Sequence, residues 1–383
     1  MPAVYKTQPR RHKAAHRRHD ILLPFPYPYP SRRHCSSPRR LGVCKAEPAG
    51  RVGHDGEVPP VDGAARQVDS YPTVDEELRR FDVYRRNVER IEATNRAGGL
   101  GYTLGENQFT DLTSEEFLAR HTGRLAPPEM SHDGDMVITT RAGDVAEGQY
   151  PAHRGNLSAV PESVDWRAKG AVTPVRHQGG CAASGAFAAV AAVEGLYQIK
   201  TGKLVPLSFQ ELVDCDSKSF HCNPGGTPAA AFTYIKMNGG IAAAADYPYT
   251  AQEGYCNSQV EQVAVSVRGY RVLPYNEQSE QKLLEAVAQQ PVAVAVNHLS
   301  FEFQSYKDGV FSGPCAFEVD RLNHQSVTIV GYGEDAATGK KYWIIKNSWG
   351  QSWGMGGYML MERGIPDPRG LCGINSYPAY PTM

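Results

Sequence analysis

The sequence lacks any apolar run long enough to cross a membrane. A membrane-spanning helix needs about 20 consecutive apolar residues, whereas the apolar run near the start, "ILLPFPYPYP", has three aliphatic residues followed by alternating prolines. The core of a secretory signal peptide takes roughly 7 to 15 apolar residues, so the run is short for that as well. We therefore expect no membrane association and no visible signal peptide.

The chain also has little net charge, since 40 Lys and Arg nearly balance 41 Asp and Glu over its 383 residues, a formal charge of -1. Without an overall basic field, nothing in the composition argues for a nucleic-acid partner. The first fifty residues differ, because runs such as "RRHKAAHRRH" contain no acidic residue. Residues 1–70 show no periodicity and are rich in Pro, Gly, Arg and His. They are expected to form a disordered basic tail, with a transit peptide or a basic interaction arm as the alternatives.

The eight cysteines lack the CxxC spacing of zinc sites. Two of them lie in the tail, at Cys35 and Cys44. The other six form an even set in the C-terminal part, which favours three disulfides in an oxidising compartment over a metal site. We expect no metal and no cofactor. The pattern alone leaves the pairing open among Cys181, Cys215, Cys222, Cys256, Cys315 and Cys372.

Regular structure is expected to begin at about Val74. The stretch "VDEELRRFDVYRRNVERIEATNR" repeats apolar residues at spacings of three and four, which predicts one long amphipathic helix ended by glycines at 98, 99 and 101. A short extended piece follows. Thr113 and Glu116 then have the spacing of a capping box, which predicts a second, short helix.

Residues 124–159 contain turn formers and little periodicity, so they are predicted to be a linker with a processing site. The following 160–383 begin with helical patterns, among them "SGAFAAVAAVEGLYQIKTGK" closed by Gly202, and "LSFQELVDC" with Ser208 and Glu211 as its capping box. Their second half contains β-branched and aromatic runs, "PVAVAV", "SVTIVGYG", "KYWIIKNSW" and "GYMLME", which indicate strands. The unit is expected to be α+β.

About four fifths of the chain, from Val74 onward, resembles a precursor of the papain-like cysteine protease family with a cathepsin-type inhibitory propeptide. The stretches "KNSWGQSWGMGGY" and "DWRAKGAVTPVRHQG" carry the resemblance in the C-terminal unit. In the N-terminal unit, "GENQFTD" matches the propeptide motif GxNxFxD. The long-helix motif, with Tyr where Phe is usual, is matched by Glu76, Arg80, Tyr84, Asn87, Ile91 and Asn95.

The resemblance implies a two-lobe fold, with a helical lobe and a β-barrel-like lobe at 160–383, preceded by an α-helical propeptide at 71–123. It implies a monomer whose propeptide lies in its own cleft, and peptide or protein substrates. Asp111, Glu115 and Glu116 are candidates for acid-sensitive pairs at that interface. The compartment would be extracellular, vacuolar or lysosomal. The implied disulfides are Cys181–Cys222, Cys215–Cys256 and Cys315–Cys372.

The same resemblance implies the site residues. Ser184 stands at the nucleophile position, with Gln178 as oxyanion donor, His324 as general base and Asn347 as the residue that orients the base. Substrate-binding positions carried over from the family are Gly225, Gly226, Thr227, Pro228, Ala295, Asn323 and Trp349.

Three departures fall on this site. The family has Cys-Trp where this chain has Ser184-Gly185. It has five residues between the histidine and "GYG", where "QSVTIV" supplies six, so His324 is expected to be displaced unless a bulge absorbs the extra residue. Pro224 is inserted in the substrate loop. Cys181 is a poor substitute nucleophile, because it follows Gln178 by three residues rather than six and would leave Cys222 without a partner.

These observations predict a papain-family protein that is inactive or a very weak pseudoprotease. A serine has no preformed anion and needs a base placed to take its proton. The first alternative is an active endopeptidase, which would use Ser184 or a cysteine at that position in the true product. The second is a storage or binding protein on a protease fold, and a zinc-binding or regulatory protein is a further reading.

Overall fold

A computed structural model describes residues 71–121, 129–130, 136–137, 160–216, 220–223, 225–257, 259, 262–274, 279–315 and 324–383. All of these lie in one compact unit, Pro60–Met383. The expectation of a basic tail falls outside the described residues, as does most of the expected linker, of which only the strand pair β2 (Glu129–Met130) and β3 (Met136–Val137) is described. We call 71–121 the N-terminal segment and 160–383 the C-terminal segment.

The N-terminal segment contains the two predicted helices. The first, α1 (Val74–Ala97), starts where the Thr73 side chain accepts from the Glu76 N–H and ends at Gly98, whose φ of 66° suits glycine. The strand β1 (Tyr102–Leu104) follows, and then α2 (Ser114–His121). The predicted capping box is present at α2, because Thr113 and Glu116 exchange side chain-to-backbone hydrogen bonds at 3.0 and 3.2 Å.

The inward face of α1 is more polar than its apolar repeat suggests. Leu78 and Phe81 are exposed, at 62% and 60%, whereas Arg80 is buried at 5%. The guanidinium of Arg80 is held by Glu76 at 2.7 Å and by Glu116 of α2 at 2.8 Å. A buried ion pair therefore fixes the contact between α1 and α2, and leaves part of the apolar repeat facing solvent.

The first half of the C-terminal segment forms a helical lobe. It contains α3 (Ser184–Thr201), which Gly202 closes at φ 76°, α4 (Gln210–Cys215) and α5 (Pro228–Met237). Half of the predicted capping box of α4 is present: Ser208, one residue before the N-cap Phe209, accepts from the Glu211 N–H at 3.0 Å, whereas the Glu211 carboxylate accepts from the Ala242 N–H at 2.7 Å. Alanine and aromatic side chains of these helices pack into one buried core.

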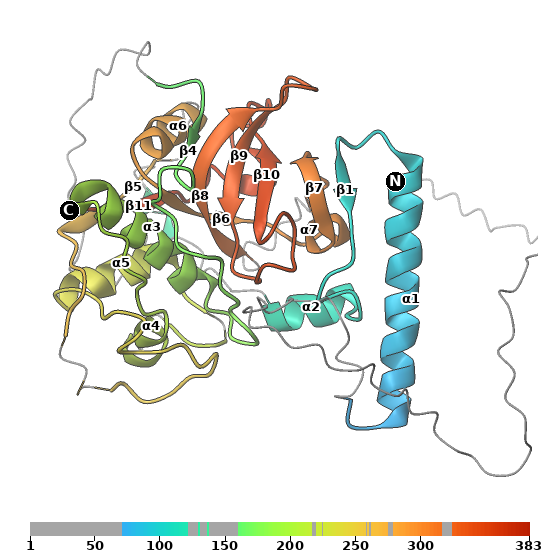
Figure 1. Ribbon diagram of the computed structural model, residues 1–383, viewed down its shortest axis with the longest axis horizontal. Helices are drawn as coiled ribbons and strands as arrows, with labels where there is room; N and C mark the ends of the chain where they lie inside the picture. The colour runs from blue at the N-terminus through green and yellow to red at the C-terminus, as the bar shows by residue number, and fades with distance from the viewer. Residues whose placement is uncertain are drawn as a thin grey trace, which may run out of the picture. The chain divides into compact units, whose positions relative to one another are not determined.

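The second half supplies most of a sheet in which nine of the described strands pair, in the order β1-β7-β10-β9-β8-β6-β11-β5 with β4 on β8. β1 of the N-terminal segment lies antiparallel along β7, and α1 lies outside it (Figure 1). The four predicted strands are confirmed. The bounds are β4 (Val164–Asp165), β5 (Gly269–Val272), β6 (Val292–Val296), β7 (Tyr306–Phe311), β8 (Gln325–Glu334), β9 (Lys341–Lys346), β10 (Tyr358–Glu362) and β11 (Ala379–Thr382).

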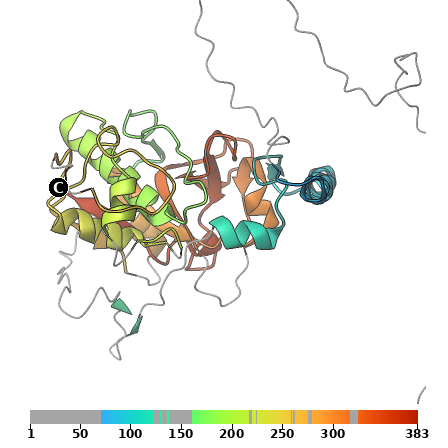
Figure 2. The same ribbon diagram turned by 90° about the horizontal axis from the view of Figure 1, so that it is seen from below.

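Smaller helices complete the segment: α6 (Ser279–Gln289), α7 (Phe301–Gln304) and the 3-10 turn η2 (Leu371–Gly373). A second core, separate from that of the helical lobe, joins the sheet to the N-terminal segment. Seen from below, α1 stands end-on at one edge with α2 between it and α3 (Figure 2). No helix in the described part of the chain has the length and apolar content of a membrane span.

The three disulfides form in the pairing that the resemblance implied. Cys181 is bonded to Cys222. The others are Cys215–Cys256 and Cys315–Cys372. The first ties the chain just before α3 to the loop before α5, so the start of α3 is held against the loop expected to bind substrate.

Candidate functional site

Ser184 is the first residue of α3 and is buried, with 2% of its surface exposed. Its Oγ accepts a hydrogen bond from the backbone N–H of Ser326, on β8, at 3.2 Å. A helix N-terminus carries a partial positive charge and favours an anion. The position therefore suits a thiolate, but the hydroxyl found there is neutral and is bonded to backbone.

Gln178 is fully buried beside this helix start. Its Nε2 donates to the Cys181 carbonyl at 3.1 Å, and its Oε1 accepts from Ser348 Oγ at 2.6 Å. The amide is therefore fixed at both ends. In this arrangement one of its two N–H groups points at a backbone carbonyl.

Gln325 joins the other two amides of the site. Its Nε2 lies 2.9 Å from Asn347 Oδ1, 3.0 Å from Gln178 Oε1 and 3.0 Å from Ser348 Oγ. The contact with Asn347 that the family motif assigns to His324 is thus made by the residue after it. An amide cannot accept a proton as a base does, so this contact carries no acid-base chemistry.

His324 itself is turned elsewhere. Successive side chains of a strand alternate between its two faces, so with Gln325 directed at Asn347 its neighbour points the other way. The His324 ring packs edge-on to Tyr377 at 6.4 Å, and its Nδ1 has no hydrogen-bond partner among the described residues. Burial lowers the pKa of His324. Burial therefore favours the neutral form of this imidazole, which lies away from the amides of the site.

The expected substrate loop lies directly on the start of α3. A Cβ added at Gly185 would be 1.9 Å from the Gly226 carbonyl oxygen, and one at Gly225 would be 2.2 Å from the Ala182 oxygen. Thr227 caps α5 through its Oγ1, with Pro228 as the next residue. The glycine at 185 is therefore required by the loop, and a tryptophan there would displace it.

Ala295 and Trp349 complete the predicted substrate-binding positions that are described. Ala295 of β6 pairs with Ser326 of β8, beside the Ser184 contact. Trp349 is fully buried in an aromatic cluster, with Phe109 and Phe117 of the N-terminal segment at 5.5 and 5.1 Å. Asn323 and Pro224 lie outside the described residues.

Polar contacts also hold the N-terminal segment in place. Asn107 Nδ2 donates to the Gln304 carbonyl at 2.8 Å, and Gln304 Nε2 donates back to the Phe109 carbonyl at 3.1 Å. Arg90 pairs with Glu302 at 2.9 Å and lies over the Phe301 ring. The segment is therefore docked on α7 and on the turn that carries Trp349.

The acidic residues expected at this interface are placed differently. Glu116 bonds to Arg80 and Arg79, both on α1, so its ion pairs lie within the N-terminal segment. Burial would raise the pKa of Glu116, but the Thr113 N–H and the two guanidiniums outweigh it and lower the pKa to about 2. Asp111 receives the hydroxyl of Tyr71, again within the segment. Among the described residues, the carboxylate in an ion pair across the interface is that of Glu302, with Arg90.

Buried histidines line the interface instead. His121, at the end of α2, packs on Phe109 at 4.8 Å, and burial, followed by His177 and Arg120, lowers its pKa to about 4. His298 lies 5.7 Å from the Trp349 ring, and burial lowers its pKa to about 3. Both rings are neutral above these values, so they act as apolar packing groups at neutral pH.

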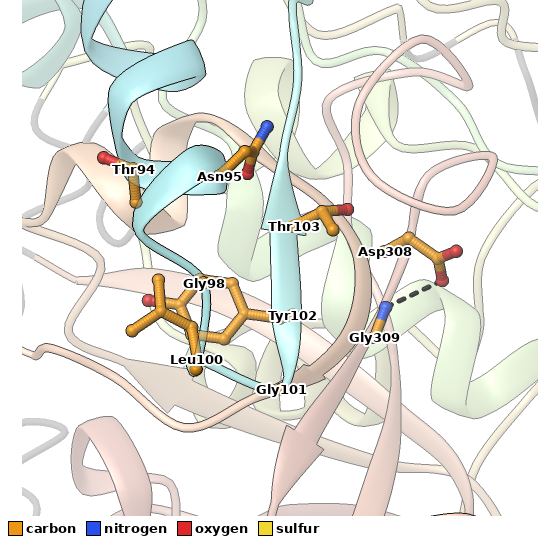
Figure 3. A pocket seen from close by; sticks show the side chains of 10 residues that line it. Thr94, Asn95, Gly98, Leu100, Gly101, Tyr102, Thr103, Asp308 and Gly309 are labelled. Carbon is orange, nitrogen blue, oxygen red and sulfur yellow. Dashed lines mark hydrogen bonds between the residues drawn. The ribbon is translucent and has the colours of Figure 1, made fainter.

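A cavity of about 340 Å³ lies away from this site, between the end of α1, β1 and β7. Gly98, Leu100, Gly101 and Tyr102 line one side, and Asp308, whose carboxylate accepts from the Gly309 N–H at 2.7 Å, lies on the other (Figure 3). Four of its ten lining residues are glycines. The described residues contain no group of three or more side chains that could hold a metal ion.

The fold and these contacts define a class of protein. It has two lobes, and the buried N-terminus of α3 lies against the side-chain amides of Gln178, Gln325 and Asn347. A docked helical N-terminal segment covers this site. Residues 160–382 match the papain family cysteine protease, and residues 69–117 match the cathepsin propeptide inhibitor domain. Senescence-specific cysteine protease SAG12 of Arabidopsis thaliana is 44% identical over 82% of this chain and 86% of its own length. Fruit bromelain of Ananas comosus is 43% identical, over 82% of each chain.

Solved structures agree with this. A recombinant stem bromelain precursor has a TM-score of 0.70 at 43% identity, covering 82% of this chain and 94% of its own. The proform of the ragweed pollen cysteine protease Amb a 11 has a TM-score of 0.67 at 36% identity, covering 80% and 88%. The chain therefore belongs to the papain family of cysteine proteases, and its N-terminal segment is a propeptide inhibitor domain docked on its own protease domain.

Sequence reasoning missed two residues of the site. Gln325 carried a signal, because five residues separate it from "GYG", as many as separate the family's histidine from that motif. His298 carried none, since a lone histidine after a strand does not reveal that it will pack under a propeptide.

Proposed function

We propose that this chain is a papain-family precursor whose peptidase site is strongly impaired, so that it carries out little or no proteolysis. The observation that carries the proposal is the hydrogen bond that the side chain of Asn347 accepts from Gln325. The hydrogen bond that should orient a base comes from Gln325, and the hydroxyl at the nucleophile position is bonded to the Ser326 backbone. Nucleophile and base are both altered.

The proposed roles follow the family residue by residue. Ser184 stands at the nucleophile position, Gln178 at the oxyanion donor and Asn347 at the residue that orients the base, while His324 is the histidine of the motif, displaced from Asn347. Trp349 would shield the pair. Gly225, Gly226, Thr227, Pro228, Ala295 and Asn323 are the proposed substrate-binding positions.

The expected loss of rate is large. Removing the nucleophile of a catalytic triad costs on the order of 10⁶ in kcat and leaves roughly 10³ to 10⁴ over water from oxyanion stabilisation and binding. Here one of the two N–H groups of Gln178 donates to the Cys181 carbonyl, which leaves the second for an oxyanion. What remains is a fold able to bind peptide segments, as it binds its own propeptide, in an oxidising compartment outside the cell or in a vacuole.

A second candidate is an active endopeptidase that uses Ser184. The docked propeptide supports it, because inhibition is needed only where there is activity to inhibit. Propeptides of this kind also assist folding in relatives, so its presence is compatible with an impaired enzyme as well.

The test compares the acid-treated full chain with its Ser184→Cys and Ser184→Ala variants, using a fluorogenic peptide and an epoxide thiol trap. We expect no labelling at residue 184 in the natural protein, and peptide hydrolysis equal to that of Ser184→Ala. Hydrolysis that exceeds the Ser184→Ala level by roughly 100-fold, a small part of the loss expected for a missing nucleophile, would reject the proposal in favour of the second candidate.

A further inference from the structure

The base position of this site is the position whose side chain is hydrogen-bonded to Asn347, and Gln325 makes that bond. In β8, Gln325 pairs with Val296 and Ser326 pairs with Ala295. The β8–β9 register shifts only between Ile329 and Gly331, after these residues. The side chain at 325 therefore enters the site, while the backbone at 326 touches Ser184 Oγ at 3.2 Å.

The amide of Gln325 is a poor fit to that place. Its Nε2 has two hydrogens and three oxygens within 3.0 Å. Its own Oε1 is buried without a partner among the described residues, and so is Asn347 Nδ2. A buried polar atom without a partner costs about 1 to 3 kcal/mol. The surroundings of residue 325 offer acceptor oxygens that would suit the N–H of an imidazole ring. They offer no hydrogen-bond donor to Oε1 of Gln325.

The other histidines do not compete for the place. His324 packs against Tyr377 and interacts electrostatically with His298, which lies on Trp349. Neither imidazole is within hydrogen-bond distance of Asn347 or Ser184.

We infer that residue 325, not the histidine at 324, occupies the base position of this cleft. Gln325 is a positioning residue there: it holds Gln178 and Asn347 through one amide nitrogen and cannot take a proton. The inference rests on the proposed function, because it explains why a cysteine restored at 184 would find no imidazole. It predicts that a histidine at 325 would lie between Asn347 and residue 184.

The experiment measures the pKa of a thiol at 184 in the full chain. Cys35 and Cys44 are replaced by serine and Ser184 by cysteine, which leaves one cysteine outside the three disulfides. Thiolate absorbance in the ultraviolet and the rate of iodoacetamide alkylation are followed against pH. The same measurements are made after adding His324→Gln, Gln325→His, or both changes together.

Gln325→His is expected to lower the thiol pKa by about two units or more, which is a 100-fold rise in the thiolate-to-thiol ratio. The double change should do the same, and His324→Gln alone should leave the pKa unaltered. Gln290→His is the control, since Gln290 is buried before the start of β6, whose other end pairs with Gln325 and Ser326, and its amide bonds to the Pro381 carbonyl. It should have no effect on the thiol.

A thiol pKa that rises on His324→Gln, or that Gln325→His leaves unchanged in folded protein, would overturn the inference. If Gln325→His does not fold, the His324→Gln comparison decides the question by itself. Hydrolysis by the natural protein that depends on Ser184 would reject the proposed function, but it would not alter the thiol pKa values that test this inference.

Discussion

Acid should loosen the propeptide through His121. The ring is 7% exposed and packs against Phe109 and Phe117, and its pKa is lowered from an ordinary 6.5 to about 4. Burial is the main cause, since a charged ring is poorly solvated there, and the neighbouring His177 and Arg120 add repulsion. A backbone hydrogen bond with Gly179 opposes them in part.

The direction of the pH effect on stability depends on whether the docked or the undocked state binds a proton at the higher pH. Between pH 6.5 and about 4 the unfolded or undocked chain binds a proton at His121 and the docked chain does not, so stability falls as the pH falls through this range. Because one pKa unit corresponds to about 1.4 kcal/mol, the full effect is about 3 kcal/mol. Above the ordinary pKa the contribution is constant.

The assay is urea unfolding of the full chain at a series of pH values, followed by tryptophan fluorescence. Trp349 reports on docking because Phe109 and Phe117 cover it. His121→Leu should reduce the loss of unfolding free energy across this pH range by about 2 to 3 kcal/mol. Phe117→Leu is the matched control, which removes packing at the same interface but no titratable group. Because Phe117 also contacts the His121 ring, it should lower stability at every pH while keeping most of the pH slope. Equal pH slopes in His121→Leu and the natural chain would refute the reasoning.

Other predictions concern the start of α3. Gly185→Ala should lower the free energy of unfolding by about 1 to 3 kcal/mol, measured with heat or urea, because its Cβ would meet the Gly226 oxygen. Gly180→Ala, with open space around it, should lower it by less than about 0.5 kcal/mol. Equal effects of the two changes would show that the loop is not packed against Gly185. Replacing Cys181 and Cys222 together by serine opens a loop with a sequence separation of 41. It should lower the unfolding free energy by about 4 kcal/mol, and an unchanged urea midpoint would contradict the bridge.

Local patterns in the sequence predicted the elements but not the contacts between them. The long helix, the Thr113 cap and the strands of the sheet follow from periodicity and capping residues within a few positions. The burial of Arg80 does not, because its partner Glu116 is 36 residues away. The apolar repeat of α1 therefore predicted that the helix packs by its apolar face. In the structure the ion pair between Arg80 and Glu116 places another face of α1 inward.

The site was predictable only in part, for a similar reason. The family motifs located Ser184, Gln178 and Asn347, and the extra residue after His324 warned of displacement. The residue count before "GYG" also pointed to Gln325, but it could not say whether a bulge would bring His324 back to Asn347, since that depends on the pairing of β8 with β6 and β9. The close contact of Gly226 with Gly185 likewise joins two segments about forty residues apart, so local sequence patterns do not predict it.

The most direct test of an impaired site is self-processing. The purified full chain is held at about pH 4 to 5, where His121 loosens the propeptide, and is followed by gel electrophoresis and mass spectrometry at several protein concentrations. We expect the chain to remain uncut between residues 124 and 160. Concentration-independent cleavage in that range, abolished by Ser184→Ala, would contradict the account.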